Sequence, residues 1–280
     1  MKYVSYKDGG HAVPGLLQGD RIHRIAASSM REFIALMPED RASRITDETI
    51  AFHDAELDAP VRPERNVFCV GRNYLEHAKE GARAAGRELK LPALPTFFTK
   101  APTAIIAPEA MLHLQARISP EYDFEAELAV VIGQRCRDVN ETNAHDVIFG
   151  YTCLNDITAR DRQRSHGQWF KGKSLDDTCP IGPWIISTHE VPNPQTLAIR
   201  FRLNGIEKQS SNTSHMIFPI ARIIAELSAG MTLLPGDIIA TGTPDGVGFA
   251  RVPPEFLRDG DEMEVEIEGI GILHNQVTIV

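Results

Sequence analysis

The stretch Asp123-Phe124-Glu125-Ala126-Glu127-Leu128 places two acidic residues at the start of an apolar run that is typical of a buried strand. On an extended strand, Glu125 and Glu127 project from the same face. Asp156 follows a second apolar run, Val147 to Leu154, so a neighbouring strand could supply a third carboxylate. Crowded buried carboxylates repel one another, and a hard divalent cation such as Mg²⁺ or Mn²⁺ relieves that repulsion. The open alternative is an exposed strand face whose acids meet water.

Composition narrows the class of protein. The chain has 280 residues, 42% of them hydrophobic and 24% charged, which is ordinary for a soluble globular protein with a large core. Its formal net charge of −9 argues against nucleic acid as a partner, because phosphate binding needs a basic surface. No stretch has the length or apolarity of a transmembrane helix or a secretory signal, so no membrane partner is expected.

The four cysteines show no spacing typical of a zinc site or a disulfide framework. We therefore expect reduced thiols and a cytoplasmic location. These cysteines are Cys69, Cys136, Cys153 and Cys179.

The chain divides at a proline-rich and charged segment, Pro60 to Arg65, which has the composition of a linker. Residues 1–60 are predicted to form a small α+β domain with a helix over Ser29 to Met37, and residues 66–280 the main body. Three short strands are expected in the first part: one beginning at Tyr3, Val4 and Tyr6, then Pro14 to Leu17 and Ile22 to Ala26.

The main body reads largely as β structure, with one clear helix over Pro219 to Ala229. Strands without regular intervening helices favour a β-rich roll or barrel over a doubly wound sheet. The predicted strands are Asn66 to Val70, Thr96 to Thr99, Leu128 to Ile132, Val147 to Leu154, Trp184 to Ser187, Ala198 to Leu203, Asp237 to Thr241, Met263 to Ile267 and Ile272 to Val280.

A histidine and a glutamate stand three residues apart in the segment that follows the strand Asn66 to Val70. On a helix, His77 and Glu80 share one face, and the carboxylate would then orient the imidazole as a general base. The alternative is a solvated surface pair. The next segment, Gly81 to Leu94, has the glycines, prolines and mixed charge of a mobile lid over a ligand.

The stretch Gly167-Gln168-Trp169-Phe170-Lys171-Gly172-Lys173-Ser174 matches the nucleotide-binding pattern Gly-x-x-x-x-Gly-Lys-Ser. Such a loop must follow a buried strand and open a helix. Here polar residues precede it, and Pro180 and Pro183 prevent a long helix after it. We therefore expect no nucleotide site.

A glycine-rich loop, Thr241 to Gly248, follows a predicted strand. It is either a structural turn or a ligand clamp, in which backbone amides and the Thr243 hydroxyl hold a carboxylate.

Taken in order along the chain, these motifs closely resemble the fumarylacetoacetate hydrolase family. The resemblance covers roughly residues 66–280. The motifs are Asn73-Tyr74-x-x-His77-x-x-Glu80, Glu125-x-Glu127-Leu128, Asn155-Asp156-x-Thr158-Ala159-Arg160-Asp161, Gly172-Lys173-Ser174 and Thr241-Gly242-Thr243-Pro244-x-Gly246-Val247-Gly248.

The resemblance implies a mainly β fold with α+β elements, the family's mixed β-sandwich roll, preceded by the small N-terminal α+β domain that many bacterial members carry. It also implies a homodimer. Residues fall into three groups by the resemblance: Glu125, Glu127 and Asp156 as ligands of Mg²⁺ or Mn²⁺; His77, Glu80 and Lys173 as catalytic residues; and Arg72, Tyr74, Gln163 and Thr243 as substrate contacts. Asp123 occupies a position that is a further metal-site carboxylate in some members and another residue in others.

The activity that this combination favours is a metal-dependent hydrolysis of a C–C bond in an acylpyruvate or another β-diketo acid, through a pyruvate enolate. A 2-oxo acid can chelate a hard cation through its carboxylate and carbonyl, and Lys173 adds positive charge where the enolate develops. The alternative within the family is an isomerase or decarboxylase that acts on 2-hydroxydienedioates or oxaloacetate in aromatic-compound catabolism.

Overall fold

The computed structural model describes all 280 residues, and nearly all of its strands belong to two large β-sheets. The larger sheet has twelve strands and is mainly antiparallel. In spatial order it contains β4 (Ile45–Ala51), β3 (Arg21–Ile25), β2 (His11–Gln18), β1 (Lys2–Asp8), β14 (Cys179–Ser187), β12 (Ile148–Asn155), β11 (Ala126–Ile132), β17 (Ile238–Ala240), β6 (Val67–Gly71) and β7 (Thr96–Lys100), with β5 (Leu57–Asp58) beside β1 and β8 (Ile105–Ile106) beside β14.

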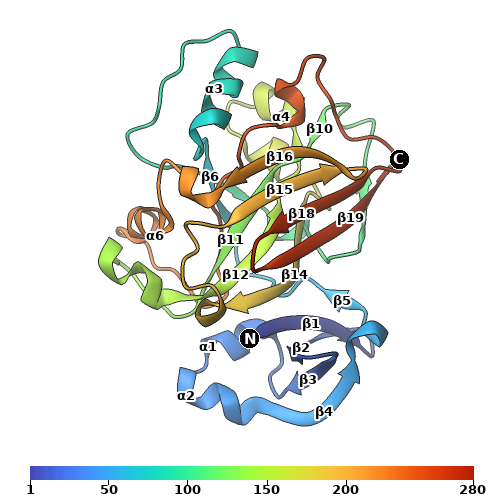
Figure 1. Cartoon of the computed structure of the whole chain (residues 1–280), viewed down its shortest axis with the longest axis vertical. Coiled ribbons are helices and arrows are strands. Elements are labelled where there is room, and N and C mark those ends of the chain that lie inside the picture. The colour runs from blue at the N-terminus through green and yellow to red at the C-terminus, as the bar shows by residue number, and fades with distance from the viewer.

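The second sheet has five strands and packs over one face of the larger sheet (Figure 1). Its order is β16 (Ile206–Asn212), β15 (Ala198–Leu203), β18 (Glu262–Ile267), β19 (Gly271–Ile279) and β9 (Met111–Leu114). A pair of two-residue strands, β10 (Tyr122–Asp123) and β13 (Thr158–Ala159), joins the segments that flank β11 and β12.

Alternation along the strands explains this layering. In β15, Ile199, Phe201 and Leu203 are buried, while Arg200 and Arg202 point outward and pair with glutamates of β18. The period of two is what a strand with one buried face requires. Phe201 stacks on Phe124 with ring centroids 4.2 Å apart, which fixes the five-stranded sheet against the segment that leads into β11.

β11 is buried on both faces, and its side chains divide between two cores. Leu128, Val130 and Ile132 pack toward the five-stranded sheet, whereas Ala129 and Val131 join a core on the opposite face with residues of α1 (Met30–Ala35). Glu127 stands two residues before Ala129, so its side chain lies on the same face as Ala129 and Val131. The acidic residues therefore lie on the face that the five-stranded sheet does not cover.

The helices are short, and none is long and apolar enough to span a bilayer. α6 buries Ile220, Ile223, Ile224 and Leu227, as its sequence pattern predicted, although Pro219 is its N-cap. Ser29 caps α1 through its side chain, and the predicted helix to Met37 ends earlier, at Ala35. The remaining helices are α2 (Pro38–Arg41), α3 (Leu75–Ala84), α4 (Arg160–Ser165) and α5 (Phe170–Lys173).

The N-terminal part, β1 to β5 with α1 and α2, forms the lower lobe in Figure 1. Its three predicted strands are confirmed as β1, β2 and β3. Within the large sheet, β1 connects the strands of this lobe to those of the main body, with Lys2 opposite Ile186 and Tyr3 opposite Ile185 of β14. A domain boundary near residue 60 stays a prediction. In the main body, every predicted strand is confirmed, and the mixed sandwich of two sheets agrees with the expected fold class.

Phe201→Ala should lower the free energy of unfolding by about 3–5 kcal/mol, because it removes the buried ring that stacks on Phe124 and leaves a cavity between the sheets. Urea denaturation measures this change. Ile206→Ala is the matched control on the same sheet, since Ile206 is 60% exposed and should cost less than about 0.5 kcal/mol. Equal effects of the two substitutions would contradict the packing described here.

Candidate metal centre and active-site cavity

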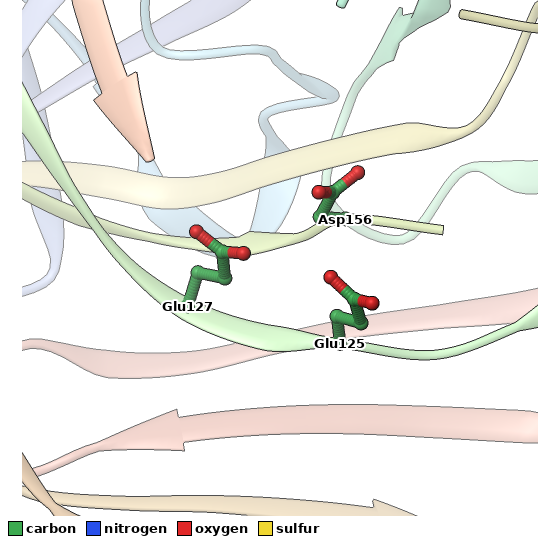
Figure 2. A group of neighbouring side chains, drawn as sticks. All are labelled: Glu125, Glu127 and Asp156. Atoms are coloured by element: carbon green, nitrogen blue, oxygen red, sulfur yellow. The ribbon is translucent and has the colours of Figure 1, made fainter. Parts of the chain in front are cut away.

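Three carboxylates converge where β11 begins and β12 ends. Glu125 and Glu127 project from one face of the β11 segment, and Asp156 directly follows β12 (Figure 2). One oxygen atom from each lies within 4.8 Å of the others. Two hydrogen bonds fix the junction, since the Asp156 amide donates to the Glu125 carbonyl at 2.8 Å and the Glu125 amide donates to Oδ1 of Asn155 at 3.0 Å. All three acids are buried.

Two lysines neutralise part of this acidic cluster. Nζ of Lys173 lies 2.7 Å from Oε2 of Glu125 and 2.6 Å from Oδ2 of Asp156. Nζ of Lys100 lies 2.7 Å from Oδ1 of Asp156 and donates to the Ile157 carbonyl at 3.0 Å. Both lysines are buried, so the ion pairs form away from water.

A buried arginine, Arg160, pairs with Asp123 and Glu125. Arg160 contacts Asp123 through Nε at 2.8 Å and Glu125 through Nη2 at 2.7 Å, while its guanidinium stacks on the Phe249 ring. Burial opposes ionisation of Glu125, but the nearby Lys173, Arg160 and His77 lower its pKa to about 2. Glu125 is therefore a carboxylate at every physiological pH.

Glu127 is the exception, because no lysine or arginine pairs with it. Its carboxylate accepts one hydrogen bond, from the Gly242 amide at 2.7 Å. Burial raises the pKa of Glu127 well above its usual range, and the negative charges of Asp156 and Glu125 raise it further. A buried carboxylate beside two others, without a cationic partner, is the environment that a hard divalent ion with oxygen ligands would stabilise. The three carboxylate ligands, one of them without a cationic partner, thus fit Mg²⁺ or Mn²⁺.

His77 and Glu80 form the predicted pair on α3. Nδ1 of His77 lies 2.9 Å from Oε1 of Glu80. The other carboxylate oxygen, Oε2, accepts a hydrogen bond from the Gly246 amide at 2.9 Å. Glu80 is buried, and His77 lines the same cavity as Glu125 and Glu127. An imidazole that donates from Nδ1 to Glu80 keeps Nε2 as a proton acceptor. The pair is therefore no solvated surface contact.

The glycine-rich loop binds carboxylates of the protein itself. The amides of Gly242, Gly246 and Gly248 donate to Glu127, Glu80 and Asp123, respectively. A ligand carboxylate cannot use these three amides, so the predicted amide clamp is wrong for them. The loop instead connects the acidic cluster, the histidine pair and Arg160.

The cavity beside these groups has a volume of about 1240 Å³. Of the predicted substrate contacts, Arg72, Gln163 and Thr243 line it. Tyr74 does not line it: the side chain is buried near Glu127, and its hydroxyl has no hydrogen-bond partner. Only part of the predicted lid is a loop, because Gly81 to Ala84 complete α3. Arg87 to Lys90 of the following loop line the cavity.

The nucleotide-like stretch serves the acidic cluster. Trp169 is the N-cap of α5, whose last residue, Lys173, directs its amine at Glu125 and Asp156. Burial favours a neutral amine, but these two carboxylates outweigh it and hold the pKa of Lys173 above its ordinary value. The segment before α5 is the helix α4, where a nucleotide-binding loop would need a strand.

Sequence reasoning missed two buried cations of the candidate site and left the role of one acid open. Lys100 directly follows a predicted strand and gave no signal, whereas Arg160 stands inside a motif that was assigned no role for it. Asp123 is not a fourth carboxylate of the cluster. Its carboxylate oxygens accept hydrogen bonds from Arg160 and from the amides of Gly248 and Phe249, so Asp123 orients the arginine and the loop.

Comparisons with known proteins agree with this architecture. The family model described as "Fumarylacetoacetate (FAA) hydrolase C-terminal" matches residues 66–278. The chain is 44% identical over 225 residues to "Oxaloacetate tautomerase YisK" of Bacillus subtilis (strain 168), covering 80% of this chain and 73% of that protein.

Two solved structures superpose over 100% of this chain. One is "Fumarylacetoacetate hydrolase (EaFAH)" from psychrophilic Exiguobacterium antarcticum, with a TM-score of 0.83, 39% identity and 100% of that chain covered. The other is a 2-hydroxyhepta-2,4-diene-1,7-dioate isomerase from Mycobacterium marinum, with a TM-score of 0.82, 36% identity and 98% of that chain covered. The chain belongs to the fumarylacetoacetate hydrolase family.

Proposed function

We propose that this protein catalyses divalent-ion-dependent proton transfer next to the carbonyl group of a 2-oxo acid, the chemistry of an oxaloacetate tautomerase or a hydroxydienedioate isomerase. The observation that carries the proposal is the His77–Glu80 pair in the same cavity as the carboxylate cluster, in which Glu127 has no cationic partner. A relative at 44% identity is named an oxaloacetate tautomerase and a solved structure at 36% identity a 2-hydroxyhepta-2,4-diene-1,7-dioate isomerase, and both names support it.

Glu125, Glu127 and Asp156 would hold the ion, which supplies Lewis-acid polarisation of a carbonyl when bound. Nε2 of His77 takes a proton from the carbon next to the carbonyl, or from a carbon conjugated with it, and the C–H electron pair forms the enolate. The carbonyl oxygen then receives a proton and gives the enol, and the reverse transfer gives the ketone. Glu80 holds the imidazole through Nδ1 and stabilises its protonated form. The ammonium group of Lys173 provides positive charge where the substrate oxygen becomes negative.

C–C bond hydrolysis, which the sequence motifs favoured, is the second candidate. The same histidine pair can activate water, and one of the solved structures is named a fumarylacetoacetate hydrolase. Water would add to the distal carbonyl of an acylpyruvate and give its proton to His77. The C–C electron pair would then leave as pyruvate enolate, which takes up a proton. Both reactions develop the same negative oxygen, so the residues serve either one.

The partner we propose is thus a small 2-oxo acid. A homodimer and a cytoplasmic location stay predictions. The four cysteines are free thiols, which fits a reducing compartment.

Glu127→Gln should abolish activity and weaken Mg²⁺ binding by more than the roughly 10- to 100-fold that the loss of an outer-shell partner costs. Without ions, the same substitution should raise the stability of the folded protein. The pKa of folded Glu127 is raised, so its stabilising contribution is present at low pH and is lost as pH rises through that pKa. At neutral pH the glutamine should therefore stabilise the ion-free protein.

Thermal unfolding with EDTA and with Mg²⁺ measures both effects of this substitution. Glu121→Gln is the matched control, because Glu121 lines the same cavity but pairs with Arg164. If Glu127→Gln keeps the full gain in Tm from Mg²⁺, Glu127 is no ligand.

His77→Gln should lower kcat by about 10²- to 10⁴-fold, the usual loss when a general base is removed, while Mg²⁺ still raises Tm as in the wild type. The assays are enol-to-keto conversion of oxaloacetate, isomerisation of a 2-hydroxydienedioate and pyruvate release from an acylpyruvate. His113→Gln is the control, since His113 is exposed and pairs with Asp177 away from the cluster. Unchanged kcat would remove His77 from the mechanism, and turnover of acylpyruvate alone would favour the hydrolase.

A further inference from the structure

Gln209 is the only buried residue of the edge strand β16, with 1% of its surface exposed. The register between β16 and β15 shifts between Phe201 and Arg202, which marks a β-bulge, and a bulge re-aims the side chains around it. A buried carboxamide must find hydrogen-bond partners inside the protein. The partners of Gln209 therefore indicate what this side chain does.

Two backbone groups fix the orientation of the Gln209 carboxamide. Its Oε1 accepts a hydrogen bond from the Ala126 amide at 2.9 Å, and its Nε2 donates to the Pro244 carbonyl at 2.8 Å. A backbone N–H can only donate and a carbonyl can only accept, so the flipped carboxamide would lose both bonds. Nε2 also lies 2.8 Å from Oγ1 of Thr243. In this bond the threonine oxygen must be the acceptor.

The Thr243 hydroxyl consequently keeps its own proton for a ligand. Thr243 lines the cavity, and its hydroxyl donates to no group of the protein. Thr241 of the same loop differs, because its hydroxyl donates to the Leu128 carbonyl at 2.8 Å. A hydroxyl group has a single proton. That of Thr243 is free to bind an acceptor atom inside the cavity.

Gln209 also connects this hydroxyl with the acidic cluster. Ala126, which donates to Gln209, stands between Glu125 and Glu127 at the start of β11. Gln209 itself does not line the cavity, so it contacts no bound ligand directly. One carboxamide thus holds the glycine-rich loop against the strand segment that carries two of the three clustered acids.

We propose that Gln209 is a positioning residue that makes the Thr243 hydroxyl a hydrogen-bond donor to a negatively charged oxygen of the bound 2-oxo acid. The inference rests on the proposed function, in which such an oxygen develops beside the acidic cluster. A donor that is oriented before the ligand arrives loses little rotational freedom on binding. It also stabilises an enolate oxygen more than a neutral carbonyl oxygen.

A double-mutant cycle on the binding of oxalate measures this role without turnover. Oxalate is a dianion with the adjacent oxygens of a pyruvate enolate, and it is titrated calorimetrically in the presence of Mg²⁺. Thr243→Val removes the hydroxyl, whereas Thr243→Ser retains it. Gln209→Glu keeps the shape of the side chain, but a carboxylate can only accept, so the Thr243 proton would turn to it and away from the ligand. A pH of about 8.5 keeps this carboxyl group ionised.

In the wild-type background, Thr243→Val should weaken oxalate binding by about 10- to 100-fold, the contribution of a hydrogen bond to a charged group, and Thr243→Ser by about threefold or less. In the Gln209→Glu background, Thr243→Val should change the Kd by less than about twofold. Comparing the two proteins within one background cancels the effect of the added charge. Gln134→Glu is the matched control, since Gln134 is exposed and does not line the cavity, and it should leave the full effect of Thr243→Val.

Thermal unfolding shows whether each variant is folded, and Gln209→Met, which adds no charge, replaces Gln209→Glu if that variant is not. In Gln209→Met the hydroxyl is free to take three staggered positions, so Thr243→Val should cost about threefold less than in the wild type. The proposal is overturned if oxalate does not bind, if Thr243→Val has no effect in the wild type, or if its effect is equally large in the Gln209 variants. Intact coupling without turnover of any 2-oxo acid would support the positioning role and refute the proposed reaction.

Discussion

An imbalance of buried charge governs the structure around the site. Four buried carboxylates, Asp123, Glu125, Glu127 and Asp156, face three buried cations, Lys100, Arg160 and Lys173. Burying a charge is tolerable only where a partner compensates it. The cations pair with every acid except Glu127, which lines the cavity. The fold thus leaves one carboxyl group without a cationic partner, and its raised pKa favours the neutral form until an ion binds.

The sandwich of two sheets brings these groups together from distant parts of the chain. β11 and β12 supply the acids, β7 ends at Lys100, and the glycine-rich loop after β17 donates an amide to each of three carboxylates. At Gly246, φ is +100° and a Cβ atom would meet the Lys208 carbonyl at 2.2 Å, so this amide position requires glycine. Because one loop binds both Glu80 and Glu127, it ties the His77–Glu80 pair to the acidic cluster.

Much of this could be predicted from the sequence, because strand periodicity and the Glu125-x-Glu127 spacing are local properties. The α6 face and the β15 alternation were predictable for the same reason. Strand β16 was not: Ile206–Asn212 is polar, lies at a sheet edge and is held by its pairing with β15. Lys100 and the role of Asp123 were also missed, since ion pairs between distant segments leave no local pattern. The role of the glycine amides, in a structural turn or in a ligand clamp, stayed open because the carboxylates that they bind lie far away in sequence.

The central claim is that one divalent ion sits among Glu125, Glu127 and Asp156. The most direct measurement is anomalous X-ray scattering from crystals grown with Mn²⁺. The account predicts a single strong peak about 2.0–2.3 Å from one oxygen of each residue, with the Lys173 amine moved out of the triad. A map without a peak there, or a peak bound by other side chains while Lys173 still bridges Glu125 and Asp156, would contradict it.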